Sequence, residues 1–375
     1  MHLILHSTAL FSNKRRFQYF LGGRCSIAQD NIVQKDNNLI QESCNIVFYF
    51  SIMSSTLVHI TEDRVRKLLD WEATLAAVET SLVAVSQNRA IQNPRSFTNV
   101  LGTKDLLLCM PGYVQNGTNG TLACKMVTVC ANNEKLDPPL PSILANIFLF
   151  NEKSGQLKGI IEATEITAWR TAAASVAATK CLHFGHAERK SNIVAILGAG
   201  TQGRIHAIAF QHFFNFKMIH IWNHRFEKAK LLVEELMSLG IPARVFETSK
   251  ECVTDADVIV TATFTPNPIV HLAWIKPNVH INAVGAGANH HSELDEALYH
   301  NSVIYVDHMA GAKVELAGLE KMGVQLVGEI GELISNDKPL PQNDKITIFH
   351  SLGMAAEDAA VGQIIYDRFM KELIE

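Results

Sequence analysis

The sequence lacks the features that mark a membrane-spanning, metal-binding or nucleic-acid-binding protein. No apolar run approaches the roughly 20 residues that a helix needs to cross a bilayer. The seven cysteines are scattered, with no C-x-x-C pair and no His-rich segment, which favours free thiols over a zinc site or a disulfide framework. A formal net charge of −4 gives no broad basic surface for nucleic acid. We therefore expect a cytoplasmic protein without a metal, membrane or nucleic-acid partner.

Internal repeats and low-complexity tracts are also absent, and the composition is that of a globular protein, with 47% hydrophobic and 19% charged residues. A chain of 375 residues is too long for one small core and suits two domains. Residues 1–52 differ from the rest, because a basic stretch precedes the first acidic residue, Asp30. They are either a mitochondrial targeting segment or, as we favour, a disordered extension before Met53.

The strongest motif is a glycine-rich turn in the middle of the chain. An unbroken apolar run, Ile193–Leu197, has the character of a strand buried on both faces, and Gly198-Ala-Gly-Thr-Gln-Gly203 follows it. Gly198 allows a tight turn, Gly200 lets a pyrophosphate approach the backbone, and Gly203 lets the next helix pack on the sheet. The free N–H groups at the start of that helix suit a phosphate. This pattern predicts a dinucleotide site that includes Thr201 and Gln202.

The second strand of the same unit, Met218–Trp222, determines the choice of cofactor. NAD-selective sites carry Asp or Glu about 20 residues beyond the glycines. This sequence instead has Asn223-His224-Arg225, followed by Lys228 one turn later. No carboxylate is present to repel a 2′-phosphate, and Arg225 has the geometry to bind one. We therefore expect NADPH, with NADH as a weaker alternative.

Further apolar strands continue the alternation, and those at 257–263 and 280–284 are followed by loops that should line the nicotinamide half of the site. The predicted fold class is α/β, with a Rossmann NADP(H)-binding domain at 176–341. An α+β substrate-binding and dimerisation domain would be built from 53–175 and 342–375. In this scheme the last strand, Ile346–Phe349, and the closing helix return to the α+β domain.

Three basic residues of the first half of the chain stand out. Pro94 forces an extended backbone that presents Arg95. Lys125 lies between apolar neighbours in a strand, which is typical either of an edge-strand charge or of a site residue that meets a carboxylate. Arg170 lies near the start of an alanine-rich helix, and an arginine in such a position is more often solvated than functional.

Six separated motifs carry a family resemblance that extends from about Met53 onward. They are Met110-Pro-Gly-Tyr113, Ile166-Thr-Ala-Trp-Arg-Thr-Ala172, Ala195-Ile-Leu-Gly-Ala-Gly-Thr-Gln202, Ile221-Trp-Asn223, His280-Ile-Asn-Ala-Val-Gly-Ala286 and Ser351-Leu-Gly-Met354. In these motifs the chain resembles the ornithine cyclodeaminase/mu-crystallin family, and within it the mu-crystallin (ketimine reductase) branch. The resemblance implies a homodimer and an NADPH-dependent reduction of C=N bonds in small cyclic ketimine carboxylates.

The resemblance also implies roles for individual residues. Lys125 and Arg170 would be catalytic, and Arg95, Lys125 and Leu352 would bind substrate. The remaining positions, with Arg170 again, would contact the cofactor: Ser142, Thr171, Gly198, Gly200, Thr201, Gln202, Gly203, Asn223, His224, Arg225, Phe264, Thr265, Val284 and Gly287. From the residues alone, the proton donor is either Lys125 or a water.

One departure from the family separates the alternatives. The cyclodeaminases use an Asp where this chain has Gly287, so ornithine cyclisation lacks its acid–base residue. An ornithine cyclodeaminase or an amino-acid dehydrogenase that uses NAD(H) is the rival within the family. A non-catalytic crystallin-like protein that binds NADPH and an iodothyronine hormone is the rival of another class.

Overall fold

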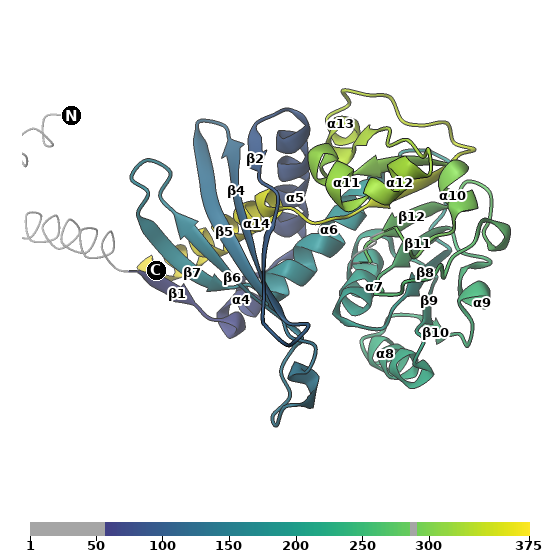
Figure 1. Cartoon of the computed structure of the whole chain (residues 1–375), viewed down its shortest axis with the longest axis horizontal. Coiled ribbons are helices and arrows are strands. Elements are labelled where there is room, and N and C mark those ends of the chain that lie inside the picture. The colour runs from purple at the N-terminus through teal and green to yellow at the C-terminus, as the bar shows by residue number, and fades with distance from the viewer. Residues whose placement is uncertain (1–56, 286–290) are drawn as a thin grey trace, which may run out of the picture. The chain divides into compact units, whose positions relative to one another are not determined.

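The computed structural model describes residues 57–285 and 291–375, so the predictions for residues 1–52 and for Gly287 lie outside the described residues. Leu57–Glu375 forms one compact unit, which contains two β-sheets (Figure 1). None of the helices in the described part of the chain combines the length and hydropathy that crossing a membrane requires.

The first sheet has seven strands, in the order β1-β7-β6-β5-β4-β2, with β3 also paired to β4. β1 and β7 are parallel, and the other neighbouring strands are antiparallel. The strands are β1 (Val58–Ile60), β2 (Ala90–Gln92), β3 (Ser96–Asn99), β4 (Leu106–Asn116), β5 (Asn119–Val129), β6 (Ile143–Phe150) and β7 (Leu157–Glu162). β4 and β5 form the hairpin that the Asn-Gly turn predicts, and Gly117 in that turn has φ +61°.

The two faces of this sheet differ in their environment. The inner face carries Met110, Lys125 and Ile147, which are paired across three strands and buried. The helix α14 (Ala355–Ile374) covers that face. The helices α4 (Glu62–Leu68) and α5 (Trp71–Ser86) lie between β1 and β2 in the chain, and the side chain of Asp70 caps α5. The outer face is half-buried and largely apolar.

The second sheet has eight parallel strands, in the order β10-β9-β8-β11-β12-β15-β13-β14. They are β8 (Ile193–Leu197), β9 (Met218–Trp222), β10 (Ala243–Val245), β11 (Val258–Thr261), β12 (His280–Ala283), β13 (Ser302–Val306), β14 (Gly328–Glu329) and β15 (Ile346–His350). The chain runs outward from β8 through β9 and β10 and then returns to β11 on the other side of β8. Open parallel sheets bind ligands at such a reversal, at the carboxyl ends of the strands.

One 3₁₀ turn connects β5 to β6 in the first sheet, while the other helices and turns of this group connect strands of the second sheet. The group consists of η1 (Asn133–Lys135), α7 (Thr201–Phe214), α8 (Phe226–Ser238), α9 (Ser249–Val253), η2 (Leu272–Trp274), α10 (Glu296–His300), α11 (Met309–Glu315), α12 (Ala317–Lys321) and α13 (Ile330–Ile334). The expected fold class, a Rossmann sheet with an additional α+β part, is confirmed.

The last strand lies elsewhere than the sequence predicts. β15 lies inside the parallel sheet, between β12 and β13, and does not return to the first sheet. Its five residues are all buried, as an inner strand of a parallel sheet requires. Within the segment from 342 onward, β15 belongs to the parallel sheet, and α14, which follows it, packs on the first sheet.

The helix α6 (Thr164–Leu182) runs between the two sheets and contacts both β6 and β12 (Figure 1). Its alanines are buried on several sides, as the sequence predicts from their small size. The predicted N-cap, Thr164, is instead the first helical residue, and Ala163 occupies the cap position. The buried α6 brings Arg170 and Thr171 toward the parallel sheet.

Candidate functional site

The glycine turn after β8 has a distinct steric reason for each of its three glycines. Gly198 has φ +122°, and a Cβ there would lie 2.4 Å from the carbonyl oxygen of Ala262. A Cβ at Gly203 would lie 1.8 Å from the carbonyl oxygen of Gly198. A Cβ at Gly200 would meet nothing within 4 Å. The first and third glycines therefore build the turn, while the second leaves open space at the N-terminus of α7, where a pyrophosphate fits.

Asn223 holds this turn to the loop after β9. Its Oδ1 accepts a hydrogen bond from the Ala199 N–H at 3.2 Å, and its Nδ2 donates to the Arg225 carbonyl at 3.0 Å. His224 and Arg225 are exposed, and Nε of Arg225 lies 3.2 Å from Nε2 of His224. The two exposed basic side chains are thus adjacent to the turn, with no carboxylate at the positions where NAD-selective sites carry one.

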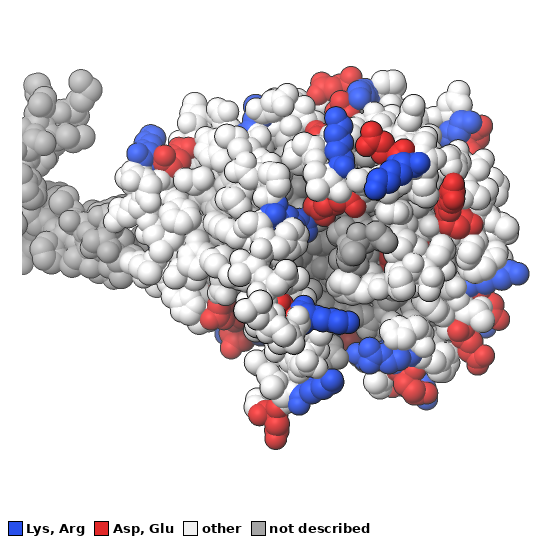
Figure 2. Space-filling view, viewed as in Figure 1, with Lys and Arg blue, Asp and Glu red and all other residues white. Residues whose placement is uncertain are grey.

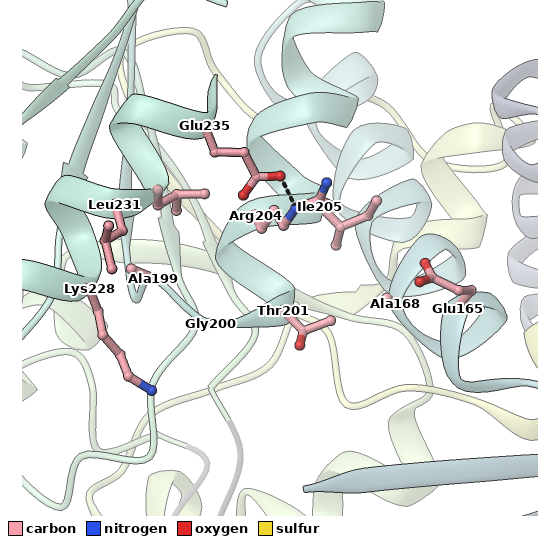
Figure 3. A pocket seen from close by; sticks show the side chains of 11 residues that line it. Glu165, Ala168, Ala199, Gly200, Thr201, Arg204, Ile205, Lys228, Leu231 and Glu235 are labelled. Carbon is pink, nitrogen blue, oxygen red and sulfur yellow. Dashed lines mark hydrogen bonds and ion pairs between the residues drawn. The ribbon is translucent and has the colours of Figure 1, made fainter. Parts of the chain in front are cut away.

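A cavity of about 510 Å³ opens beside the turn and is lined by residues of α6, α7 and α8. Figure 3 shows Gly200 and Thr201 on one side of it and Lys228 on another. Nε of Arg204 donates to Oε1 of Glu235 at 2.6 Å across the cavity wall (Figure 3). The cavity thus lies next to the open space at Gly200, and its lining combines the basic side chains of Arg204 and Lys228 with the carboxylates of Glu165 and Glu235.

The second cluster lies where β5, α6 and α14 meet. Nζ of Lys125 is 2.7 Å from Oδ2 of Asp358, and Nε of Arg170 donates to Oδ1 of the same carboxylate at 3.1 Å. Nη1 of Arg170 also donates to Oε2 of Glu357 at 3.2 Å. The side chains of Lys125, Arg170 and Asp358 are 1%, 7% and 1% exposed. Lys125 is therefore not an edge-strand charge, and Arg170 is not solvated.

Arg95 joins this cluster from the segment after β2. Its Nη2 donates to the carbonyl oxygens of Leu352 and Gly353, and its Nε lies 3.1 Å from Oε1 of Glu315. Oδ2 of Asp307 accepts from the N–H groups of Leu352 and Gly353, each at 2.7 Å. Asp307 follows β13 and Leu352 follows β15, so the cluster lies at the carboxyl edge of the parallel sheet. The glycine turn lies at the same edge.

Burial shifts the acid–base properties of this cluster. It lowers the pKa of Lys125 to about 8, and the positive charge of Arg170 acts in the same direction. Burial raises the pKa of Glu357 to about 8, although Arg170 opposes the shift. Burial also raises the pKa of Asp307 to about 6, although the hydrogen bonds that it accepts from the N–H groups of Gly353 and Leu352 act to lower it. Burial thus moves the pKa values of three groups of one cluster toward neutral pH, which is typical of active sites.

The residues expected around the nicotinamide lie at the ends of β11 and β12. Phe264 is 72% exposed, and the Oγ1 of Thr265 donates to the Asn267 carbonyl at 3.0 Å. Val284 follows β12 and is half-buried. Ser142 precedes β6, and Thr171 is buried with its hydroxyl bonded to the Thr167 carbonyl. Gly287 lies outside the described residues.

The acidic members of the site were not identified from the sequence. Asp307, Glu357 and Asp358 are buried, and Glu293 links two loops by accepting from the Thr263 and Gly285 N–H groups. One signal was available, because Glu357 and Asp358 interrupt an alanine-rich segment at the start of the closing helix. Their partners could not be inferred, since Asp358 and Arg170 are 188 positions apart.

Comparisons with known proteins agree with this geometry. A family model described as "Ornithine cyclodeaminase/mu-crystallin family" matches residues 56–372. The chain is 35% identical to "Ketimine reductase mu-crystallin" of Macropus fuliginosus, over 82% of this chain and 95% of that protein.

Two solved structures share the fold. One is the Delta(1)-pyrroline-2-carboxylate reductase of Thermococcus litoralis in complex with NADH and L-proline. It is 29% identical, with a TM-score of 0.77 over 84% of this chain and 98% of that chain. The other is an archaeal alanine dehydrogenase dimer with bound NAD, which is 26% identical, with a TM-score of 0.76 over 84% of this chain and 97% of that chain.

Proposed function

The chain belongs to the ornithine cyclodeaminase/mu-crystallin family, and from that premise we propose that it reduces the C=N bond of small cyclic ketimine carboxylates with NADPH. Piperideine- and pyrroline-2-carboxylate represent this substrate class. The observation that carries the proposal is the meeting of Lys125, Arg170 and Arg95 at the carboxyl edge of the sheet that bears the glycine turn. Relatives named as ketimine and pyrroline-2-carboxylate reductases support the substrate class.

The cofactor would bind at the glycine turn, where the open space at Gly200 and the start of α7 fit a pyrophosphate. Arg225, with His224 beside it, would hold a 2′-phosphate. NADH is kept as an alternative because the two solved relatives hold NADH or NAD. It is the weaker one, because this chain has no carboxylate at the position where NAD-selective sites carry one. When bound, the reduced nicotinamide supplies a hydride. Other cofactor contacts would come from Ser142, Arg170, Thr171, Gly198, Thr201, Gln202, Gly203, Asn223, Phe264, Thr265, Val284 and Gly287.

The substrate carboxylate would bind between Arg95 and Lys125. Arg95 is the more accessible of the two, with 18% of its side chain exposed, while Lys125 lies deeper in the cluster. Charge-assisted contacts to a carboxylate are strong and directional, so they orient the imine carbon. Leu352, which is 7% exposed beside Arg95, would form an apolar wall for the ring.

A homodimer through the outer face of the first sheet completes the proposal. Directly paired side chains on that face are half-buried, and Figure 2 shows few charged side chains over these strands. The face includes Pro111, Tyr113, Leu122, Cys124, Met126, Phe148, Phe150 and Ile160. An apolar area of this kind marks an interaction surface. A Phe148→Asp variant should elute as a monomer in light-scattering chromatography, whereas Leu231→Asp, on the exposed side of α8, should not.

The domain division and the compartment are part of the same proposal. Segments 53–175 and 342–375 would bind substrate, and 176–341 would bind the nucleotide, with β15 as the strand that returns to the parallel sheet. The described cysteines are free, which agrees with a reducing compartment such as the cytoplasm.

Product analysis tests the function. The protein is incubated with pyrroline- or piperideine-2-carboxylate and NADPH deuterated at the transferable position. We expect deuterium at carbon 2 of proline or pipecolate, measured by mass spectrometry. Ammonia release from ornithine would instead favour the cyclodeaminase. Binding of NADPH and of an iodothyronine, without turnover of any ketimine, would favour the non-catalytic binding protein.

A further inference from the structure

We propose that Asp358 is a positioning residue that holds the ammonium group of Lys125 in place and keeps it protonated for transfer to the imine nitrogen. This inference rests on the proposed reductase function. Asp358 lies in the first turn of α14, Lys125 in β5 and Arg170 in α6. Nothing in the sequence pattern assigned Asp358 a role.

The geometry gives each oxygen of Asp358 a different cation. Oδ2 lies 2.7 Å from Nζ of Lys125, and Oδ1 accepts from Nε of Arg170 at 3.1 Å. Lysine has a flexible side chain and a point-like charge, so a fixed carboxylate is needed to hold its ammonium in one place. Arg170 in turn holds Asp358, because its guanidinium lies between the carboxylates of Asp358 and Glu357. Asp358 is thus fixed from two sides and can orient Lys125.

Asp358 also opposes the loss of the lysine proton. Burial and the positive charges of Arg170 and Arg95 lower the pKa of Lys125 to about 8, while Asp358 raises it by charge and by hydrogen bonding. Three further carboxyl groups belong to the same cluster: Glu357 of α14, Asp307 after β13 and Glu315 of α11. Of the four acidic side chains, Asp358 is the one that contacts Nζ of Lys125. Without it, Lys125 would lose its proton at a lower pH.

The proton has a chemical destination. In a cyclic ketimine carboxylate, the imine nitrogen and the carboxylate are attached to the same carbon, so one ammonium group can contact both. Addition of a hydride to the imine carbon would form a C–H bond there, and the π pair of the C=N bond would move to nitrogen. An N–H bond then forms with a proton from Nζ. The N–H bond of Lys125 breaks with its pair left on Nζ, and water restores the proton to the neutral amine.

The test compares Asp358→Asn with Glu357→Gln. Both variants replace a carboxyl group in the same turn of α14 by an amide, and both replaced groups touch Arg170, but only Asp358 touches Lys125. In the pH dependence of kcat, we expect the alkaline limb to shift to lower pH by about one unit in Asp358→Asn. In Glu357→Gln the limb should keep its wild-type position, whatever happens to the maximal rate. A limb that moves equally in both variants, or in neither, would overturn the proposal.

A readout without turnover separates this inference from the proposed function. The protein is labelled with ¹³C at the lysine ε-carbons, and the Lys125 signal is assigned by its loss in Lys125→Gln. Nuclear magnetic resonance then gives the titration of Lys125 directly. We expect its midpoint to fall in Asp358→Asn and to stay in Glu357→Gln. If no ketimine is reduced but this shift is seen, the positioning role stands and the assigned reaction fails.

A folding defect is handled by a conservative variant. Far-ultraviolet circular dichroism establishes which variants fold. If Asp358→Asn does not fold, the same titration is made on Asp358→Glu, which keeps the charge but displaces the carboxylate. The Lys125 midpoint must then differ from that of the wild type. An unchanged midpoint in the folded variant would contradict a direct contact that controls the lysine proton.

Discussion

The guanidinium of Arg170 lies against the backbone of Gly353. Gly353 has φ +83°, and a Cβ there would lie 2.5 Å from Nη1 of Arg170. The close approach allows the same two-residue segment, Leu352-Gly353, to be held by Arg95 through its carbonyls and by Asp307 through its N–H groups. Glycine at this position therefore links the loop after β15 to the cationic cluster.

A Gly353→Ala variant tests this link. The left-handed backbone alone costs about 1 kcal/mol for a non-glycine residue. The clash with Arg170 adds to that cost and displaces the guanidinium, so we expect a lower melting temperature and at least a tenfold loss of kcat/KM. Gly102→Ala is the matched control, since Gly102 has φ +77° and open space around its Cα. Equal effects of the two substitutions on activity would show that Arg170 does not depend on this contact.

The glycine turn predicts opposite outcomes for two neighbouring substitutions. Gly203→Ala places a Cβ 1.8 Å from a backbone oxygen, so we expect destabilisation of about 3 kcal/mol in urea unfolding. Gly200→Ala meets no protein atom within 4 Å and should leave the unfolding curve nearly unchanged. It should nevertheless weaken NADPH binding, measured by nucleotide fluorescence, at least tenfold. Normal binding by a stable Gly200→Ala protein would refute the assigned pyrophosphate position.

Arg225 should determine the cofactor preference. We expect Arg225→Ala to weaken NADPH binding by about 2 kcal/mol, because one charge-assisted contact to the 2′-phosphate is lost. NADH has no such phosphate and should bind almost as before, as measured by calorimetric titration. Lys230→Ala, also exposed on α8, is the control for a general loss of positive charge. An equal loss for both nucleotides would exclude a 2′-phosphate contact.

His206 should make a defined contribution to acid sensitivity. It is fully buried between the Gln202 carbonyl and the Ser175 hydroxyl, and burial lowers its pKa from 6.5 to about 4. The unfolded chain binds this proton more readily, so stability is lost as the pH falls from about 6.5 toward 4. Between pH 7 and pH 5 the loss is about 2 kcal/mol.

The raised pKa values of Asp307 and Glu357 act in the opposite direction, so the effect is measured as a difference between variants. The free energy of urea unfolding should fall by about 2 kcal/mol less in His206→Gln than in the wild type over this interval. His300→Gln, which removes an exposed histidine, should retain the wild-type pH dependence. A His206→Gln protein with that same dependence would show that His206 is protonated as easily in the folded state as in the unfolded one.

The sequence predicts the glycine turn and the elements around it well, because they are local. The strand Ile193–Leu197, the three glycines and Asn223 lie within about one βαβ unit, and the turn chemistry follows from the residues themselves. The family resemblance likewise anticipated that Arg95, Lys125 and Arg170 belong to a site. The structure places these three residues in one buried cluster.

The acidic half of the cluster could not be predicted in the same way. Asp307 and Asp358 lie at the ends of elements that meet only after the chain has crossed between two sheets. The position of β15 has the same cause, since a short apolar strand fits either sheet by composition. Its neighbours, β12 and β13, are determined by the packing of the whole unit and not by local pattern.

The most direct test of the account is the initial rate of NADPH oxidation with piperideine-2-carboxylate at neutral pH, measured for the wild type and for Lys125→Ala. Lys158→Ala, which removes another strand lysine, is the control. We expect the wild type and Lys158→Ala to reduce the ketimine and Lys125→Ala to lose at least about 100-fold in rate, the usual loss for a proton donor. A wild-type rate no higher than that of Lys125→Ala would contradict the assignment of this buried cluster as the site of imine reduction.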